Sequence, residues 1–132
     1  MRYSKSHQDS EHQHQVALFA WADLPSIRAL YPDLDLLFAV PNGGYRRKAT
    51  GGRLKAEGVR RGVADIFLDV ARCGHHGLRI ELKAKGGSTS QEQRAWIARW
   101  TMHGYQAVVS FGWEDARREI IEYITTHMRE AI

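Results

Sequence analysis

Apolar positions recur along the chain with two periodicities, which predict a mixture of helices and strands. From residue 11 to residue 22 they recur at helical spacing, and Ser10 stands where a helix N-cap belongs. Residues 34–40 (LDLLFAV) form a continuous apolar run that stops at PNGG, residues 41–44, a sequence typical of turns. We therefore expect a helix over 11–22 and a buried strand over 34–40.

Two segments in the middle of the chain alternate between apolar and polar side chains. Apolar residues occupy positions 66, 68 and 70 in the segment 62–71, and positions 80, 82 and 84 in the segment 78–84. A period of two is the pattern of a strand with one buried face. The two segments are joined by a turn around Cys73 and Gly74, so they predict a hairpin.

The C-terminal part adds a helix, a strand and a second helix. Ser90 and Gln93 form a capping box at the start of a helix over 90–103. A strand over 105–111 and an amphipathic helix over 113–127 follow. The order α–β–β–β–α–β–α predicts an α/β fold with a central mixed sheet flanked by helices.

Length and composition indicate one soluble domain that spans residues 1–132, with residues 1–9 as a flexible N-terminal tail. No apolar run approaches the roughly 20 residues of a membrane helix, and the first 15 residues have no hydrophobic stretch that resembles a signal peptide. Because Cys73 is the single cysteine, an intramolecular disulfide and a multi-cysteine zinc site are excluded. These features favour the reducing environment of a cytoplasm.

Positive charge is concentrated in one segment. The net charge of the chain is +4, yet residues 45–61 alone hold seven Lys and Arg against one Glu. Such a segment in a small domain indicates a polyanionic partner, most often nucleic acid. The alternative is a solvated charged loop, and charge alone does not decide between the two.

Two carboxylates and one ammonium are expected to meet on the polar side of the hairpin. Asp65 and Glu81 are symmetric about Cys73, and Lys83 shares the face of Glu81. Two adjacent carboxylates repel each other unless a cation lies between them, and Mg²⁺ prefers such oxygen ligands. The alternative is a structural salt bridge between Lys83 and one carboxylate on an exposed face.

Four segments carry a resemblance to a known family. They are PNGG, GVRRGVADI, IELK and the S-x-E-Q-R-A-W sequence that starts at Ser90, and they occur in the order seen in virus-type replication-repair nucleases. This family is a branch of the PD-(D/E)xK nuclease superfamily, and the resemblance covers roughly residues 10–125. It implies a restriction-endonuclease-like core, catalysis with Mg²⁺ or Mn²⁺, and DNA as the substrate.

The resemblance also implies roles for individual residues. Asp65 and Glu81 would be metal ligands, Lys83 the catalytic lysine, and the backbone carbonyl of Leu82 a further ligand. Glu11 matches an early acidic residue of the family that contacts metal or water, although it could also serve the positive end of its helix. Gln93 matches a catalytic glutamine, although a capping role alone is the alternative.

Further residues are expected to support these groups or to hold DNA. Gln15 lies one helical turn after Glu11 on the same face. The basic segment would bind phosphates, and Asn42 either borders the cleft or only serves the turn. The expected DNA-binding residues are Asn42, Arg46, Arg47, Lys48, Arg53, Lys55, Arg60 and Arg61.

Stand-alone relatives resemble homodimeric nucleases of branched DNA, which implies a dimer acting on four-way (Holliday) junctions, with phage-encoded members as the example. The alternatives are a flap or other branched-DNA nuclease, and a DNA-binding module without turnover. Selection by DNA shape is favoured, because no separate base-reading module is present. Candidate dimer contacts are Trp96, Trp100, Trp113 and Tyr123, for which burial in the monomer core is the alternative.

Overall fold

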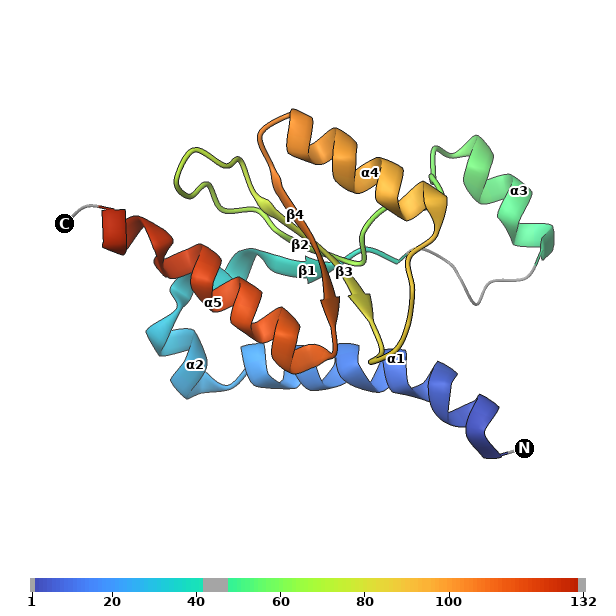
Figure 1. Cartoon of the computed structure of the whole chain (residues 1–132), viewed down its shortest axis with the longest axis horizontal. Coiled ribbons are helices and arrows are strands. Elements are labelled where there is room, and N and C mark those ends of the chain that lie inside the picture. Colours follow the sequence, from blue (N-terminus) through green and yellow to red (C-terminus); the bar gives the residue numbers. More distant parts are fainter. Residues whose placement is uncertain (1, 42–47, 131–132) are drawn as a thin grey trace.

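The computed structural model describes the backbone of residues 2–41 and 48–130 and the side chains of residues 11–41 and 52–126. Within these residues a four-stranded sheet is surrounded by helices (Figure 1). In chain order the elements are α1 (Arg2–Ala22), α2 (Pro25–Leu30), the 3-10 helix η1 (Pro32–Leu36), β1 (Leu37–Ala39), α3 (Lys48–Ala56), β2 (Ile66–Leu68), β3 (Leu78–Lys83), α4 (Gln91–Met102), β4 (Gln106–Phe111) and α5 (Trp113–Glu130).

The sheet is mixed, as the sequence predicts. Its strand order is β1-β2-β3-β4, with antiparallel pairing up to β3 and parallel pairing between β3 and β4. In the central hairpin Ile66 pairs with Ile80 and Leu68 with Leu78. These pairs are symmetric about Cys73, which has a positive φ of 48° and adopts the left-handed conformation of a tight turn. The predicted α/β class and the predicted hairpin register are both confirmed.

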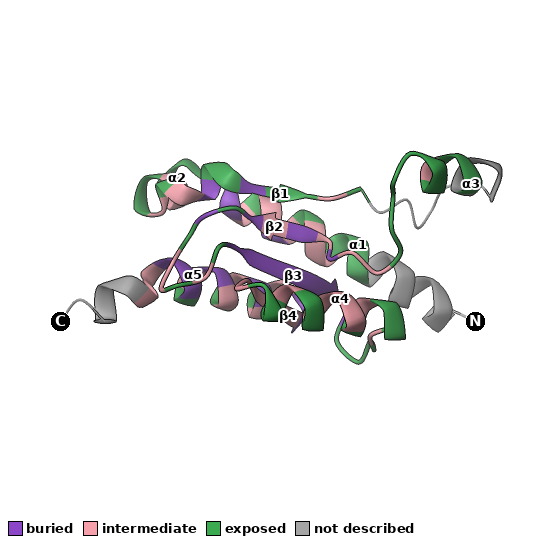
Figure 2. Cartoon of the chain, turned by 90° about the horizontal axis from the view of Figure 1, so that it is seen from above, coloured by how far each residue is buried: buried purple, intermediate pink, exposed green. Residues whose placement is uncertain are grey.

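The two faces of the sheet are covered differently. Helices α1 and α5 pack against each other and against β3, while α4 lies over β4 on the opposite side (Figures 1 and 2). Most of the buried hydrophobic side chains lie between the sheet and the α1–α5 pair, with members from α1, α5 and every strand as far as β3. No residue of α4 is fully buried. The side of the sheet under α4 is therefore the less apolar one.

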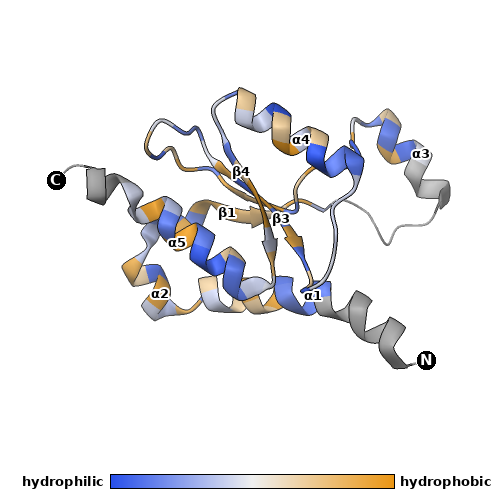
Figure 3. Ribbon diagram, in the orientation of Figure 1, coloured by the Kyte–Doolittle hydropathy of each residue, from blue (hydrophilic) through white to orange (hydrophobic). Residues whose placement is uncertain are grey.

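Hydropathy along the chain explains this arrangement (Figure 3). Apolar and hydrophilic positions alternate turn by turn along α5, so one side of the helix packs on the sheet and the other faces solvent. The hairpin strands turn Ile66, Leu68 and Ile80 into the same core. Their remaining side chains, which include Glu81, are left on the α4 side.

The predicted starts of the first helix and of the first strand were wrong. Helix α1 begins at Arg2, so Ser10 lies inside it rather than at its N-cap, and residues 2–9, expected as a tail, form its first part. The segment has no proline or glycine that would end a helix there. Residues 34–36 belong to η1 instead of a strand, because Pro32 favours a helical start and Leu34 donates its backbone N–H to the carbonyl of Tyr31.

Other differences concern helices and strand lengths. Helix α2 was not predicted, and part of the basic segment forms the short helix α3. Strand β2 covers three residues of the predicted segment 62–71, so Asp65 lies directly before it. No helix in the described ranges is both long and apolar enough to cross a membrane.

Candidate metal and catalytic centre

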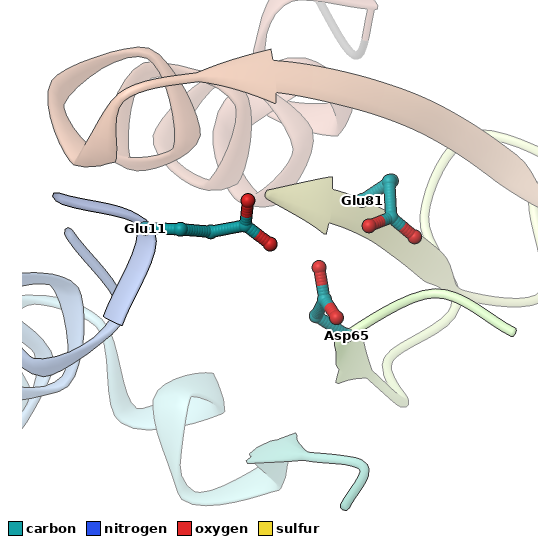
Figure 4. A group of neighbouring side chains, drawn as sticks. All are labelled: Glu11, Asp65 and Glu81. Atoms are coloured by element: carbon teal, nitrogen blue, oxygen red, sulfur yellow. The ribbon is translucent and has the colours of Figure 1, made fainter. Parts of the chain in front are cut away.

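Three carboxylates from separate parts of the chain meet at one end of the central hairpin. Glu11 extends from α1, Asp65 precedes β2, and Glu81 lies in β3 (Figure 4). One oxygen from each residue lies within 4.8 Å of the other two. The hairpin register places Asp65 opposite Glu81, and the packing of α1 against β3 adds Glu11. The structure thus brings together the three acidic residues that sequence analysis singled out.

Glu81 is almost completely buried, with only 2% of its surface exposed. Its Oε2 accepts a hydrogen bond from Gln93 Nε2 at 3.1 Å and lies 3.9 Å from Lys83 Nζ. Its Oε1 is buried and accepts no hydrogen bond from the described residues. The salt bridge of the alternative interpretation is thus present between Lys83 and Glu81, but it lies on a buried face and not on an exposed one.

Burial perturbs the acidity of this cluster. Desolvation, followed by the adjacent Asp65 carboxyl, raises the pKa of Glu81 to about 9. Burial also raises the pKa of Glu11, and the positive charge of Lys83 opposes that rise only in part. At neutral pH the metal-free cluster therefore retains a proton on Glu81. A divalent cation would supply the positive charge that the three carboxylates need in order to ionise together.

The backbone of β3 fixes Asp65. Its Oδ2 accepts a hydrogen bond of 2.9 Å from the N–H of Leu82. That bond orients one carboxylate oxygen along the strand end, next to Glu81. Leu82 itself is buried with its side chain in the core. A ligand role for its carbonyl stays a prediction.

Gln93 caps its helix and also contacts the acidic cluster, while a catalytic role stays a prediction. Its backbone N–H donates to Ser90 Oγ at 3.1 Å, and its side-chain Oε1 accepts from the Ser90 N–H at 2.8 Å. The predicted capping box is thus confirmed. The amide nitrogen of the same side chain donates to Glu81, so the start of α4 is tied directly to the acidic cluster.

The remaining expected residues lie around this centre or beyond the described residues. Gln15 is half-buried on α1, and its supporting role stays a prediction. Exposed side chains on α3 and in the loop after it belong to Arg53, Lys55, Arg60 and Arg61. Asn42, Arg46 and Arg47 lie outside the described residues, as does the side chain of Lys48, whose backbone begins α3.

One residue that holds the site in place was missed. This residue is His14 on α1, which no sequence pattern singled out. Its Nδ1 accepts a hydrogen bond of 3.0 Å from the backbone N–H of Trp113, at the start of α5. This bond fixes α1 three residues after Glu11. The partners are 99 positions apart, so no local sequence signal could have shown it.

The aromatic residues proposed for a dimer contact are used within the monomer. Tyr123 is buried and donates its hydroxyl to the carbonyl of Val70 at 2.5 Å. Trp113 packs against the core. The rings of Trp96 and Trp100 lie 5.0 Å apart on α4, and both are half-buried. The core interpretation holds for Tyr123 and Trp113.

Comparison with known proteins identifies the fold. No protein-family model matches the chain, and none of the curated proteins matches it. A solved structure described as a VRR_NUC domain protein superimposes with a TM-score of 0.74 at 29% sequence identity, over 88% of this chain and 88% of the other. The chain has a VRR-NUC fold. This similarity supports the coarse assignment of a nuclease of the PD-(D/E)xK type.

Proposed function

We propose that this VRR-NUC domain is an endonuclease that hydrolyses DNA phosphodiester bonds with Mg²⁺ or Mn²⁺. The observation that carries the proposal is the group formed by Glu11, Asp65 and Glu81, with Lys83 and Gln93 on Glu81. A structural salt bridge between Lys83 and Glu81 would not by itself explain why the carboxylates of Glu11 and Asp65 also lie beside the buried Glu81. Three acids, one lysine and one amide at the end of a hairpin match the chemistry that the fold similarity suggests.

The residues present fit a hard divalent cation. All three side chains offer carboxylate oxygens, the donors that Mg²⁺ and Mn²⁺ prefer. Glu81 Oε1 is buried without a hydrogen-bond partner among the described residues, and such an atom is costly unless something binds it. Asp65, Glu81 and Glu11 would hold the ion, with the Leu82 carbonyl as a further ligand. When bound, the ion supplies Lewis acidity toward a phosphodiester.

Lys83 and Gln93 complete the centre because both contact the Glu81 carboxylate, Lys83 by an ion pair and Gln93 by a hydrogen bond. The Lys83 side chain is only 13% exposed, so its ammonium is held near the carboxylates instead of moving in solvent. A cation in this position offsets the negative charge that develops on a phosphate during attack, and it can orient the attacking water. Gln93 fixes the Glu81 carboxylate by its hydrogen bond, and α4 shields that carboxylate from bulk water.

The substrate class follows from charge and from the fold. The basic segment 45–61 would bind DNA phosphates, the dominant source of affinity for nucleic acids. We infer selection by DNA shape, with branched DNA as the substrate and the four-way junction as the first candidate. A homodimer would present two centres for paired cuts in such a junction. We also place the enzyme in the cytoplasm, where its DNA substrate would lie.

The experiment that tests this proposal is a cleavage assay on a panel of labelled four-way, flapped and linear DNAs, with Mg²⁺, Mn²⁺ or EDTA. We expect cleavage of branched DNA that requires the metal. Preference for a flap would favour the alternative branched-DNA nuclease. Binding to DNA with no cleavage of any member in either metal would contradict the enzyme and leave a DNA-binding module.

A further inference from the structure

A hollow of about 380 Å³ lies between α4 and the loop that leads into β2. Its wall combines positive charge, an aromatic ring and amide or carboxylate groups. The volume falls at the lower end of the range for pockets that hold a small ligand. The lining residues are Arg60, Arg61, Gln91, Glu92, Ala95, Trp96 and Arg99.

Backbone contacts hold the two walls of this hollow together. Gly62 has a φ of +87°, and a Cβ there would come within 2.5 Å of the carbonyl carbon of Glu92. Glycine therefore lets the loop lie directly against the first turn of α4. One turn further along, Trp96 Nε1 donates a hydrogen bond of 2.9 Å to the carbonyl of Arg61. The hollow is a built feature of the fold, fixed at two points.

The charged groups in the hollow are arranged for an anion. The guanidinium of Arg99 lies 5.4 Å from the centre of the Trp96 ring, a cation–π contact that orients it. Neither Arg61 nor Arg99 forms an ion pair with a carboxylate of the described residues. Three arginines against Glu92 leave the lining with a formal charge of +2. Ala95 and the indole of Trp96 add an apolar floor that a lone phosphate would not need.

We propose that this hollow binds one unpaired nucleotide of the DNA strand that is cut, with its base against Ala95 and Trp96 and its phosphate on Arg61 and Arg99. The proposal rests on the proposed function, because it takes DNA as the substrate. An unpaired nucleotide fits better than a paired one, since the bases of a duplex are stacked inside the helix and cannot reach a side wall. Gln91 and Glu92 stand where they can meet the edge of the base.

The position of the hollow sets the place of this nucleotide. Arg61 lines the hollow and Asp65 lies four residues further along the chain, so their Cα atoms are at most about 14 Å apart. DNA advances about 3.4 Å per nucleotide along each strand, so we expect the bound nucleotide to lie a few nucleotides from the cut. The substrate favoured by the hollow is therefore a branched DNA with an unpaired nucleotide near the cut.

The test replaces single nucleotides in a branched substrate by abasic residues, one position at a time around the cut, and measures the dissociation constant in EDTA. With the wild-type protein we expect one position within this range where loss of the base weakens binding about tenfold. The variant Trp96→Leu should bind all substrates as the wild type binds that abasic one. Trp96→Phe keeps a ring and should restore dependence on the base.

Arg99→Gln and Arg94→Gln form the matched pair for the phosphate. Both remove one charge from α4, yet the Arg94 guanidinium donates to Thr89 at 2.7 Å and does not line the hollow. We expect Arg99→Gln to weaken binding to the unpaired substrate by about tenfold and Arg94→Gln to leave it within about twofold. Thermal unfolding must be unchanged for both.

The result that overturns the pocket is equal binding of the intact and all abasic substrates by the wild type, or equal effects of the two arginine variants. Because binding is measured without metal, this outcome can occur while the enzyme still cleaves DNA, so the two proposals fail separately. If the enzyme cleaves no DNA but the base dependence at one position remains, the pocket stands and the nuclease assignment falls.

Discussion

Glu81 is buried, so we expect its ionisation to lower the free energy of unfolding of the metal-free protein at neutral pH, although metal binding needs this carboxylate. The perturbation is Glu81→Gln, which has nearly the same shape and carries no charge. Its amide oxygen can accept the hydrogen bond from Gln93, and its nitrogen can donate toward Asp65. We expect the variant to unfold at a higher denaturant concentration than the wild type in EDTA at pH 7.

The size of the effect follows from the pKa. Glu81 titrates near 4.5 in the unfolded chain and near 9 in the folded, metal-free protein. Because the folded-state pKa is the higher one, the contribution of Glu81 to stability is fully present below pH 4.5 and is lost as the pH rises toward 9. At pH 7 the loss is about 3 kcal/mol, and at pH 5 it is below about 1 kcal/mol.

The assay is urea unfolding of both proteins at pH 5 and pH 7, with EDTA and then with Mg²⁺. The stability gained by Glu81→Gln should grow by about 2 to 3 kcal/mol between the two pH values in EDTA. Mg²⁺ should stabilise the wild type more than the variant, since only the wild type can ionise at this position to bind it. A difference that shrinks as the pH rises would refute the reasoning.

Three further predictions address the lysine, the basic segment and the assembly. Lys83→Met keeps the apolar stem without the ammonium, so the turnover number should fall by orders of magnitude at nearly unchanged DNA affinity; normal turnover with poor affinity would make Lys83 a phosphate clamp instead. Neutralising Arg46, Arg47 and Lys48 together should weaken binding to all DNAs and flatten the plot of log K against log salt, and an unchanged slope would exclude backbone contact. Light scattering at micromolar concentration should give a dimer for an enzyme that resolves four-way junctions, whereas a strict monomer that prefers a flap would argue against the junction.

The parts of the fold that were predictable depend on local or symmetric patterns. The alternation in the two hairpin segments fixed their register about Cys73, and that register placed Asp65 opposite Glu81. The cap at Ser90 was predictable because both partners lie within three residues. Local chemistry was therefore enough for the core of the candidate site.

The features that escaped prediction depend on contacts between distant segments. Ser10 has the side chain of an N-cap, yet the helix continues through it to Arg2. The bond from Trp113 to His14 joins residues 99 positions apart, and no pattern near either one signals it. The covering of the polar hairpin face by α4 is also a tertiary effect. That covering buries Glu81 and raises its pKa, so neither the burial nor the raised pKa could be predicted from the hairpin alone.

The most direct test of the central claim is Mg²⁺-dependent cleavage of one branched DNA by the wild type, Asp65→Asn and Glu81→Gln, with DNA binding measured beside it in EDTA. Asparagine is the better replacement at position 65, because its side-chain oxygen can still accept the N–H of Leu82. We expect both variants to fold, to bind DNA like the wild type and to leave the substrate uncut. Cleavage at the wild-type rate by either folded variant would contradict the acidic centre as the site of catalysis.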